Sequence, residues 1–143
     1  MIIKLNIDPI FAEVSKFTSF IGKFEENEQG PLYELIKIKD KDKAFVQASI
    51  DKGAEELIGV LSDFIIDLPE DEIVCKMPNS FKSILESKVL DLASQYLVFR
   101  CLGDWLKLTS EDNAPTYYEK AAVCLSQIHS IVYTRSKPIK RYF

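Results

Sequence analysis

The stretch FKSILESKVLDLASQYLVFRCLGDWLKL, residues 81–108, decides the fold of this chain. Its apolar residues recur at helical spacing, and past Gln95 they cover most of the helix circumference. A helix of that kind must be surrounded by other elements, so the stretch is predicted to be the central helix of a soluble domain. Charged residues interrupt it too often for a membrane span of about 20 apolar residues. These are Lys82, Glu86, Lys88, Asp91, Arg100, Asp104 and Lys107.

A second stretch, residues 44–65, has the spacing of an amphipathic helix of about five turns. The pair Leu68-Pro69 is expected to end it, because the residue before a proline disfavours helix. Gly53 and Gly59 lie inside it, and each costs about 1 kcal/mol relative to alanine. Their presence predicts two places where another helix approaches closely.

Helices are also predicted at both ends of the chain. The last one covers about five turns, with Asn113 as its cap and Pro115 in its first turn, and it ends at Ser136. The first one covers about 9–21, with Asp8 as its cap.

The caps of the two middle helices and the nature of the remaining segments are less sharply defined by the residues. Either Asp40 or Asp42 caps the helix 44–65, and either Asn79 or Ser80 caps the central helix. Segments 2–7 and 72–77 are predicted to be short strands, and 32–38 is either a strand or a lead-in to the next helix. The polar segment 23–31 ends in Gly-Pro and is predicted to be a loop.

These segments together predict a mainly α fold, a compact helical bundle of about four helices with short peripheral β-strands. At 143 residues the chain suits one domain, 1–143. Its helical core is expected over about 44–134. The N-terminal strand and helix, 1–31, and a basic tail, 135–143, are expected to be peripheral.

Composition narrows the classes of function. The start of the sequence is too polar for a signal peptide, and no segment has the length of a bilayer span, so synthesis in the cytoplasm is expected. Cys75, Cys101 and Cys124 are odd in number, far apart and in apolar surroundings, which argues against disulfides and thiolate metal sites.

The charge of the chain is unevenly distributed. The chain has a net charge of −4 and a pI of about 5.1, which gives no footprint for nucleic acid. The basic tail holds four positive charges and no acid, so the residues before it carry −8. We predict a partner-binding role for the tail through Arg135, Lys137, Lys140, Arg141, Tyr142 and Phe143, and a solvated end is the alternative.

No catalytic constellation stands out. His129 is the only histidine, and its spacing of five residues from Cys124 turns the two side chains about 140° apart on a helix. The motifs of zinc sites, phosphate loops and nucleophile elbows are absent, so no cofactor, no metal and no enzymatic activity are predicted.

Three other groups of residues are assigned structural roles. The carboxylates of the helix 44–65 are predicted to form a solvated face, and those of the turn near Pro69 an exposed acidic turn without the spacing of a calcium loop. The aromatic residues are predicted to pack in the core or between the last two helices. The first group is Asp51, Glu55, Glu56 and Asp63; the second is Asp67, Glu70, Asp71 and Glu72; the third is Tyr96, Phe99, Trp105, Tyr117 and Tyr118.

Residues 48–132 resemble the head-to-tail connector, or adaptor, proteins of tailed bacteriophages. The resemblance lies in the order of elements: a helix of the type ASIDKGAEELIGVL (48–61), a proline-containing interruption (68–78), a helix with a Leu-Ala-x-x-x-Leu centre, a polar gap (109–115) and a final helix. The centre is Leu92, Ala93 and Leu97, and the final helix carries Tyr118, Glu119, Ala121, Leu125 and Ile128. The N-terminal 40 residues and the basic tail depart from the family pattern.

The resemblance implies a non-enzymatic structural protein of a phage or prophage virion, made in the host bacterial cytoplasm. Such proteins form a ring between portal and tail, so the implied partners are portal and tail proteins and further copies of the chain, with neither specific nucleic-acid binding nor a membrane. A small cytoplasmic helical module that binds and regulates one protein partner is the alternative. An enzyme using Asp51, Glu55, Glu56 or His129 is a third, weaker hypothesis.

Overall fold

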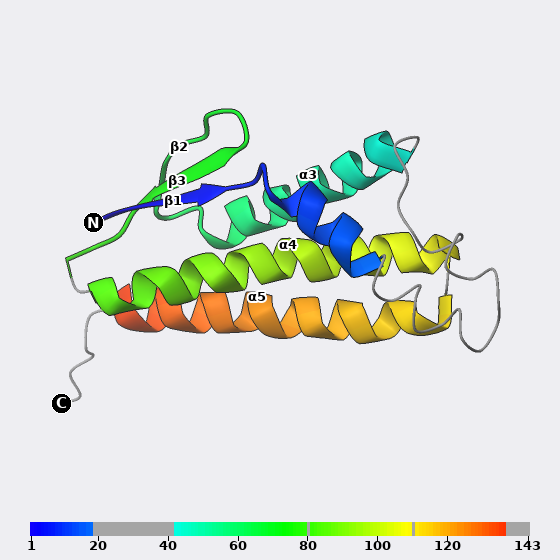
Figure 1. Ribbon diagram of the computed structural model, residues 1–143. Coiled ribbons are helices and arrows are strands. Elements are labelled where there is room, and N and C mark those ends of the chain that lie inside the picture. The colour runs from blue at the N-terminus through cyan, green and yellow to red at the C-terminus, as the bar shows by residue number, and fades with distance from the viewer. Residues whose placement is uncertain (19–41, 80, 110, 137–143) are drawn as a thin grey trace.

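The computed structural model describes residues 1–18, 42–79, 81–109 and 111–136, and they form a mainly α fold with a small sheet, as the sequence predicts (Figure 1). Its long helices are α3 (Lys43–Val60), α4 (Glu86–Thr109) and α5 (Ala114–Ser136). A shorter N-terminal helix covers 10–18 in the described part of the chain. The strands are β1 (Ile2–Asn6), β2 (Ile65–Asp67) and β3 (Glu72–Lys76).

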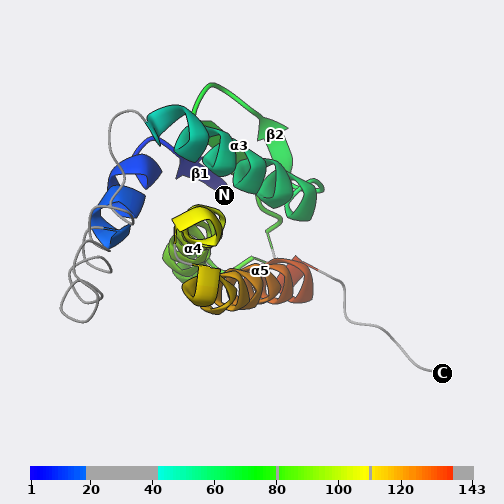
Figure 2. The same ribbon diagram turned by 90° about the vertical axis from the view of Figure 1, so that its right-hand side faces the viewer.

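Helix α4 is the centre of the molecule, as predicted. It lies between α3 on one side and α5 on the other, while the N-terminal helix flanks it on a third side (Figure 2). Helices α4 and α5 form an antiparallel hairpin (Figure 1). The residues of α4 that are buried come from nearly its whole circumference: Val89, Leu92, Ala93, Tyr96, Leu97, Val98, Cys101, Leu102, Gly103, Trp105 and Leu106.

Two glycines allow the helices to pack closely. A Cβ added to Gly53 of α3 would lie 2.9 Å from Cδ2 of Leu97, so the predicted close approach at this position is confirmed. A Cβ added to Gly103 of α4 would lie 2.8 Å from two ring atoms of Tyr118. Nothing lies within 4 Å of such an atom at Gly59, so the close approach predicted there is wrong. Gly59 is exposed on the outer side of α3.

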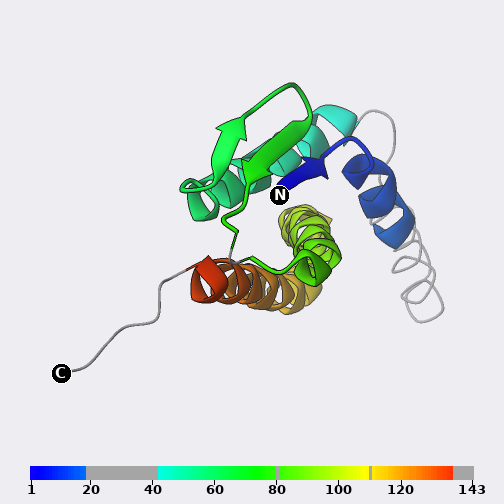
Figure 3. The ribbon, with the colours of Figure 1, turned by 90° about the vertical axis from the view of Figure 1, so that its left-hand side faces the viewer.

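The three strands form an antiparallel sheet in the order β1-β3-β2. Ile3 pairs with Cys75 and Leu5 with Ile73 across β1 and β3, and all four side chains are buried in the main core. Because side chains alternate along a strand, this inner face is apolar while Lys4 and Asn6 face outward. The sheet covers the end of the molecule where α3 finishes and α4 begins (Figure 3).

Helix α3 ends earlier than predicted. Residues 61–65 were expected to be helical, but the helix stops at Val60, and Ile65 begins β2. The carbonyl of Val60 accepts a hydrogen bond from the Tyr133 hydroxyl (2.9 Å), and the carbonyl of Phe64 accepts one from the amide of Lys76 (2.8 Å). These bonds to α5 and β3 replace the helical ones, and the apolar spacing of a short run cannot reveal them.

Helix α4 begins later than predicted. A 3-10 turn, Ser83–Leu85, leads into α4 at Glu86, so Asn79 does not cap it, and Ser80 lies outside the described residues. Phe81 is buried, with its amide bonded to the carbonyl of Pro78 in a turn (2.9 Å). The chain thus anchors one aromatic ring in the core before the helix starts.

The ends of the other predicted elements can be compared in part. Helix α5 begins at Ala114 with Pro115 in its first turn and ends at Ser136, as predicted. The first helix begins at residue 10, and its predicted end lies outside the described residues, as do segments 23–31 and 32–38 and Asp40.

The N-terminal segment is less peripheral than the sequence analysis predicts. Ile3 and Leu5 of β1 and Ile10 and Val14 of the N-terminal helix are all buried in the same core as the long helices. Their burial is possible because β1 pairs with β3, which lies 66 or more residues later in the sequence.

Candidate functional site

A polar network joins the three long helices. Its members are Ser49 and Glu56 of α3, Tyr96, Arg100 and Asp104 of α4, and Tyr118 of α5. One oxygen of Asp104, Oδ2, accepts a hydrogen bond from the Ser49 hydroxyl (2.5 Å), and the other, Oδ1, accepts one from the Tyr118 hydroxyl (2.6 Å). One carboxylate therefore connects all three helices.

Arg100 links the two carboxylates of the network. Its Nη1 donates to Glu56 and, at 3.3 Å, to the Tyr96 hydroxyl, while its Nε lies 3.8 Å from Oδ2 of Asp104. The Tyr96 hydroxyl donates to the second oxygen of Glu56. The guanidinium thus neutralises charge that would otherwise be uncompensated at the interface of α3 and α4.

The network shifts the pKa values of its members. Burial raises the pKa of Glu56, but the hydrogen bonds from Arg100 and Tyr96 outweigh it, and the net pKa lies below 4.5. Burial, with the bond to Glu56, raises the pKa of Tyr96 to about 12, and burial with the bond to Asp104 does the same for Tyr118. At neutral pH Glu56 is therefore ionised, and the Tyr96 and Tyr118 hydroxyls keep their protons.

A second feature is an open groove on another side of α4. Its first part is a hollow of about 490 Å³ between the N-terminal helix and α4. It is lined by Glu13, Phe17, Asp91, Ser94, Gln95, Val98 and Phe99. Both carboxylates are exposed, and the described residues that line this hollow include no lysine or arginine. Phe17 is 38% exposed, so the surface combines acidic and aromatic character.

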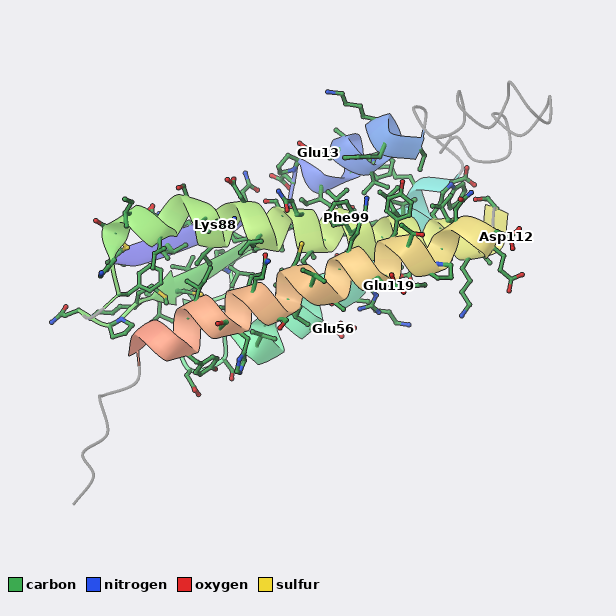
Figure 4. The ribbon with its side chains drawn as sticks, turned by 90° about the horizontal axis from the view of Figure 1, so that it is seen from below. Glu13, Glu56, Lys88, Phe99, Asp112 and Glu119 are labelled. Carbon is green, nitrogen blue, oxygen red and sulfur yellow. The ribbon has the colours of Figure 1, made fainter. Side chains whose placement is uncertain are left out.

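The groove continues towards α5. A hollow of about 420 Å³ between α4 and α5 shares Gln95 and Phe99 with the first and is otherwise lined by Thr116, Glu119, Lys120, Val123, Cys124 and Gln127. Glu13, Phe99 and Glu119 lie on three neighbouring elements in Figure 4. We call the two hollows together the acidic groove, because three carboxylates and one lysine line them.

A third hollow, of about 500 Å³, lies over the polar network. Its charges have both signs: Lys52, Arg100 and Lys107 face Asp104 and Glu111. Arg100 and Asp104 already interact with each other and with their neighbours. Their charges are therefore less available to a partner than those of the exposed carboxylates in the acidic groove.

The structure separates His129 from Cys124, as predicted. Cys124 is buried, with its thiol 3.9 Å from Oε1 of Gln95, while His129 is exposed and its ring lies 4.6 Å from that of Tyr133. All three cysteines are free and buried. Burial raises the pKa of the Cys75 thiol to about 11 and that of Cys101 to about 12, so neither is a thiolate at neutral pH.

The carboxylates of α3 divide into two groups. Asp51 and Glu55 are exposed, as predicted for a solvated face. Glu56 is also on the exposed face, with its side chain 45% exposed, but it accepts hydrogen bonds from Arg100 and Tyr96, which the prediction did not include. Asp63 follows α3 in the turn, and burial together with a hydrogen bond to Asp63 raises the pKa of the Tyr133 hydroxyl.

The turn near Pro69 is exposed and acidic, as predicted. It connects β2 to β3 and contains Asp71 in the left-handed region (φ 59°), a conformation that aspartate tolerates better than most residues. A hydrogen bond with Asp8 raises the pKa of Asp71. Within the described ranges no three residues of the His, Cys, Asp and Glu types gather as metal ligands would.

The aromatic residues pack as predicted. Tyr96 and Trp105 are buried, and the rings of Phe99 and Tyr117 meet between α4 and α5 at 6.2 Å. The Tyr118 ring covers Gly103 while its hydroxyl joins the network.

The predicted partner-binding residues lie at the end of α5 and beyond it. Arg135 belongs to the last turn of α5. Lys137, Lys140, Arg141, Tyr142 and Phe143 lie outside the described residues, so their role stays a prediction.

Sequence reasoning missed the polar network, although a signal for it exists. Tyr96, Arg100 and Asp104 are each four residues apart and so share one face of α4, and Ser49 and Glu56 are two turns apart on α3. Charges at such spacing inside an otherwise apolar helix indicate a polar contact with a neighbouring helix. The acidic groove had no comparable signal, because its residues come from three separate elements.

No match was found when the chain was compared with protein-family models, curated proteins and solved structures. Among the helices of the described ranges, none combines the length and the apolar character that crossing a membrane requires.

Proposed function

We propose that this chain is a non-enzymatic structural protein of a phage or prophage virion, a head-tail connector that forms a ring between portal and tail. It would be made in the host bacterial cytoplasm and bind portal and tail proteins and further copies of itself. The resemblance described above supplies the family. Most of the residues that carry it belong to α3, α4 and α5.

The observation that carries the proposal is that the polar side chains between the long helices bond to one another. Asp104, Arg100 and Glu56 connect helices to one another, and no buried side-chain nitrogen or oxygen of the described residues lacks a hydrogen-bond partner. A helical body that is held together by interhelical hydrogen bonds and has charged, exposed surfaces suits a protein that functions by binding neighbouring subunits.

Assembly with a portal protein tests the proposal. The full chain is mixed with the portal protein encoded by the same genome, and the mass of the product is measured by light scattering. We expect a ring of many copies on the portal and a much smaller species from the chain alone. A variant that lacks residues 135–143 should keep its helical circular dichroism and lose assembly.

A chain that stays monomeric with the portal at every concentration would contradict the proposal. Binding of a single copy to one other protein, without a ring, would favour the alternative of a small regulatory module. The acidic groove is the observation that favours that alternative, because its size suits a short peptide.

A further inference from the structure

We propose that the acidic groove binds the basic tail, residues 135–143, of a second copy of this chain. The inference rests on the proposed function, for which it supplies the contact between neighbouring subunits. It is argued from the charge of the two surfaces, from the apolar surface inside the groove and from the direction in which α5 leaves the body.

Charge is the first reason. The basic tail carries four positive charges and no acid, and the rest of the chain carries −8. In the part of the groove between the N-terminal helix and α4, Glu13 and Asp91 are exposed, and none of the lining residues that the structure describes is a cation. A short segment containing Lys140 and Arg141 can meet these two carboxylates at once.

The apolar part of the groove is the second reason. Phe17 and Phe99 pack edge to face with their ring centres 6.5 Å apart, and Phe17 remains 38% exposed. Tyr142 and Phe143 follow the two cations of the tail directly. Aromatic side chains next to arginine and lysine are what a groove with exposed phenylalanine and carboxylate would select.

Lys120, the lysine among the described residues that line the groove, defines a polarity. The amine of Lys120 lies over the rings of Phe99 and Tyr117, at 5.6 and 5.3 Å from their centres, at the end near α5. The acidic end is therefore the one near the N-terminal helix. We expect the cations of the tail to lie at that end.

The direction of α5 is the reason for a second copy. The C-terminal end of α5 lies on the side of the molecule away from the N-terminal helix in both end-on views (Figures 2 and 3). The seven residues after Ser136 can span at most about 25 Å when fully extended. Reaching the groove of the same copy would require them to turn back around the helices, whereas the groove of a neighbour imposes no such turn.

A tail that binds the groove of the next copy forms a head-to-tail contact. Such contacts use two different surfaces of each subunit, and they close into rings when the rotation between subunits permits. Each contact is small, so it is expected to be weak in isolation and to depend on many copies being held together.

Two full-length variants test the inference without a portal protein. The groove variant carries Glu13→Lys and Asp91→Lys and keeps its tail. The tail variant carries Lys140→Glu and Arg141→Glu and keeps its groove. Sedimentation velocity at rising concentration is measured for each variant alone and for their mixture.

We expect self-association of the unmodified chain to be weakened about tenfold in either variant, as the loss of two charge pairs implies. The mixture should associate again, because the tail of the groove variant meets the groove of the tail variant and the reversed tail meets the reversed groove with opposite charges. Restored association in the mixture is specific to a head-to-tail contact.

A fluorescent peptide with the sequence of residues 135–143 gives an independent measurement. It should bind the full-length tail variant. It should bind the groove variant at least about tenfold more weakly, because the same two charge pairs are lost. High salt should weaken the binding. A control variant with Glu55→Lys and Glu70→Lys has the same change of charge at exposed positions outside the groove and should bind the peptide normally.

Circular dichroism checks that each variant is folded, and Glu13→Gln with Asp91→Asn replaces the groove variant if charge reversal unfolds the chain. A peptide that binds all variants equally, or a mixture that contains only monomers, would overturn the inference. If the mixture associates but no ring forms on a portal, the proposed function fails and this contact stands. If rings form on a portal while the peptide ignores the groove, the contact fails alone.

Discussion

The side of α4 that faces α3 and the side between the N-terminal helix and α5 both carry acidic residues, but they differ in what surrounds them. On the first, Asp104 and Glu56 accept hydrogen bonds from Ser49, Arg100 and two tyrosines. On the second, Glu13 and Asp91 line an open hollow and are exposed. Carboxylates thus link helices on the first side, and on the second side they are available to bind a partner.

The largest expected effect is the loss of the Asp104 carboxylate. The variant Asp104→Ala leaves the Ser49 and Tyr118 hydroxyls and Arg100 without their acceptor, so we expect a loss of about 2–4 kcal/mol in the free energy of unfolding. Urea denaturation followed by circular dichroism measures it. The matched variant Asp91→Ala in the same helix should change stability by less than about 0.5 kcal/mol.

Equal losses from Asp104→Ala and Asp91→Ala would remove the distinction between the network and the groove. A stable Asp104→Ala protein would show that apolar packing alone holds the three helices together.

A smaller effect is expected where Tyr118 packs over α4. In Gly103→Ala the added methyl would meet the Tyr118 ring at 2.8 Å, and the ring also holds the hydroxyl bond to Asp104. Overpacking of this kind should cost about 1–3 kcal/mol. Thermal unfolding of the two glycine variants, Gly103→Ala and Gly59→Ala, gives the comparison.

Gly59→Ala is the control, because nothing lies within 4 Å of the new methyl. It should raise stability by about 0.5–1 kcal/mol through better helix propensity. Destabilisation at Gly59 that matches the loss at Gly103 would mean that another helix approaches closely at Gly59 as well.

The smallest effect concerns pH. The pKa of Glu56 in the folded chain lies below the ordinary 4.5, so between the two values the unfolded chain binds more protons. The stabilisation from Glu56 is therefore complete above pH 4.5 and is lost as the pH falls through the folded pKa. Since Glu56 is 45% exposed, we expect a contribution of only about 0.5–1 kcal/mol.

Urea denaturation at neutral and acidic pH measures this contribution. Glu56→Gln should unfold with less dependence on pH in the acidic range than the unmodified chain. A dependence that is the same in both would contradict the assignment of this effect to Glu56.

The polar network and the helix ends show how far single-sequence reasoning reached. The four-residue spacing of Arg100 and Asp104 was readable, but which helix supplied their partners was not, because Glu56 lies 44 residues from Arg100. The end of α3 was missed because the hydrogen bonds to the Val60 and Phe64 carbonyls come from α5 and β3. The acidic groove was invisible, since it needs the N-terminal helix, α4 and α5 to be placed side by side.

The sequence by itself determined that this chain is built on helices, that the stretch 81–108 would supply their centre and that Cys124 and His129 would not meet, because these follow from periodicities within one segment. Tertiary structure alone decided which carboxylates are structural and which are available. A charge is neutralised by what lies within a few ångströms of it, and for Glu56, Asp104, Glu13 and Asp91 those neighbours come from other elements of the chain or are replaced by solvent.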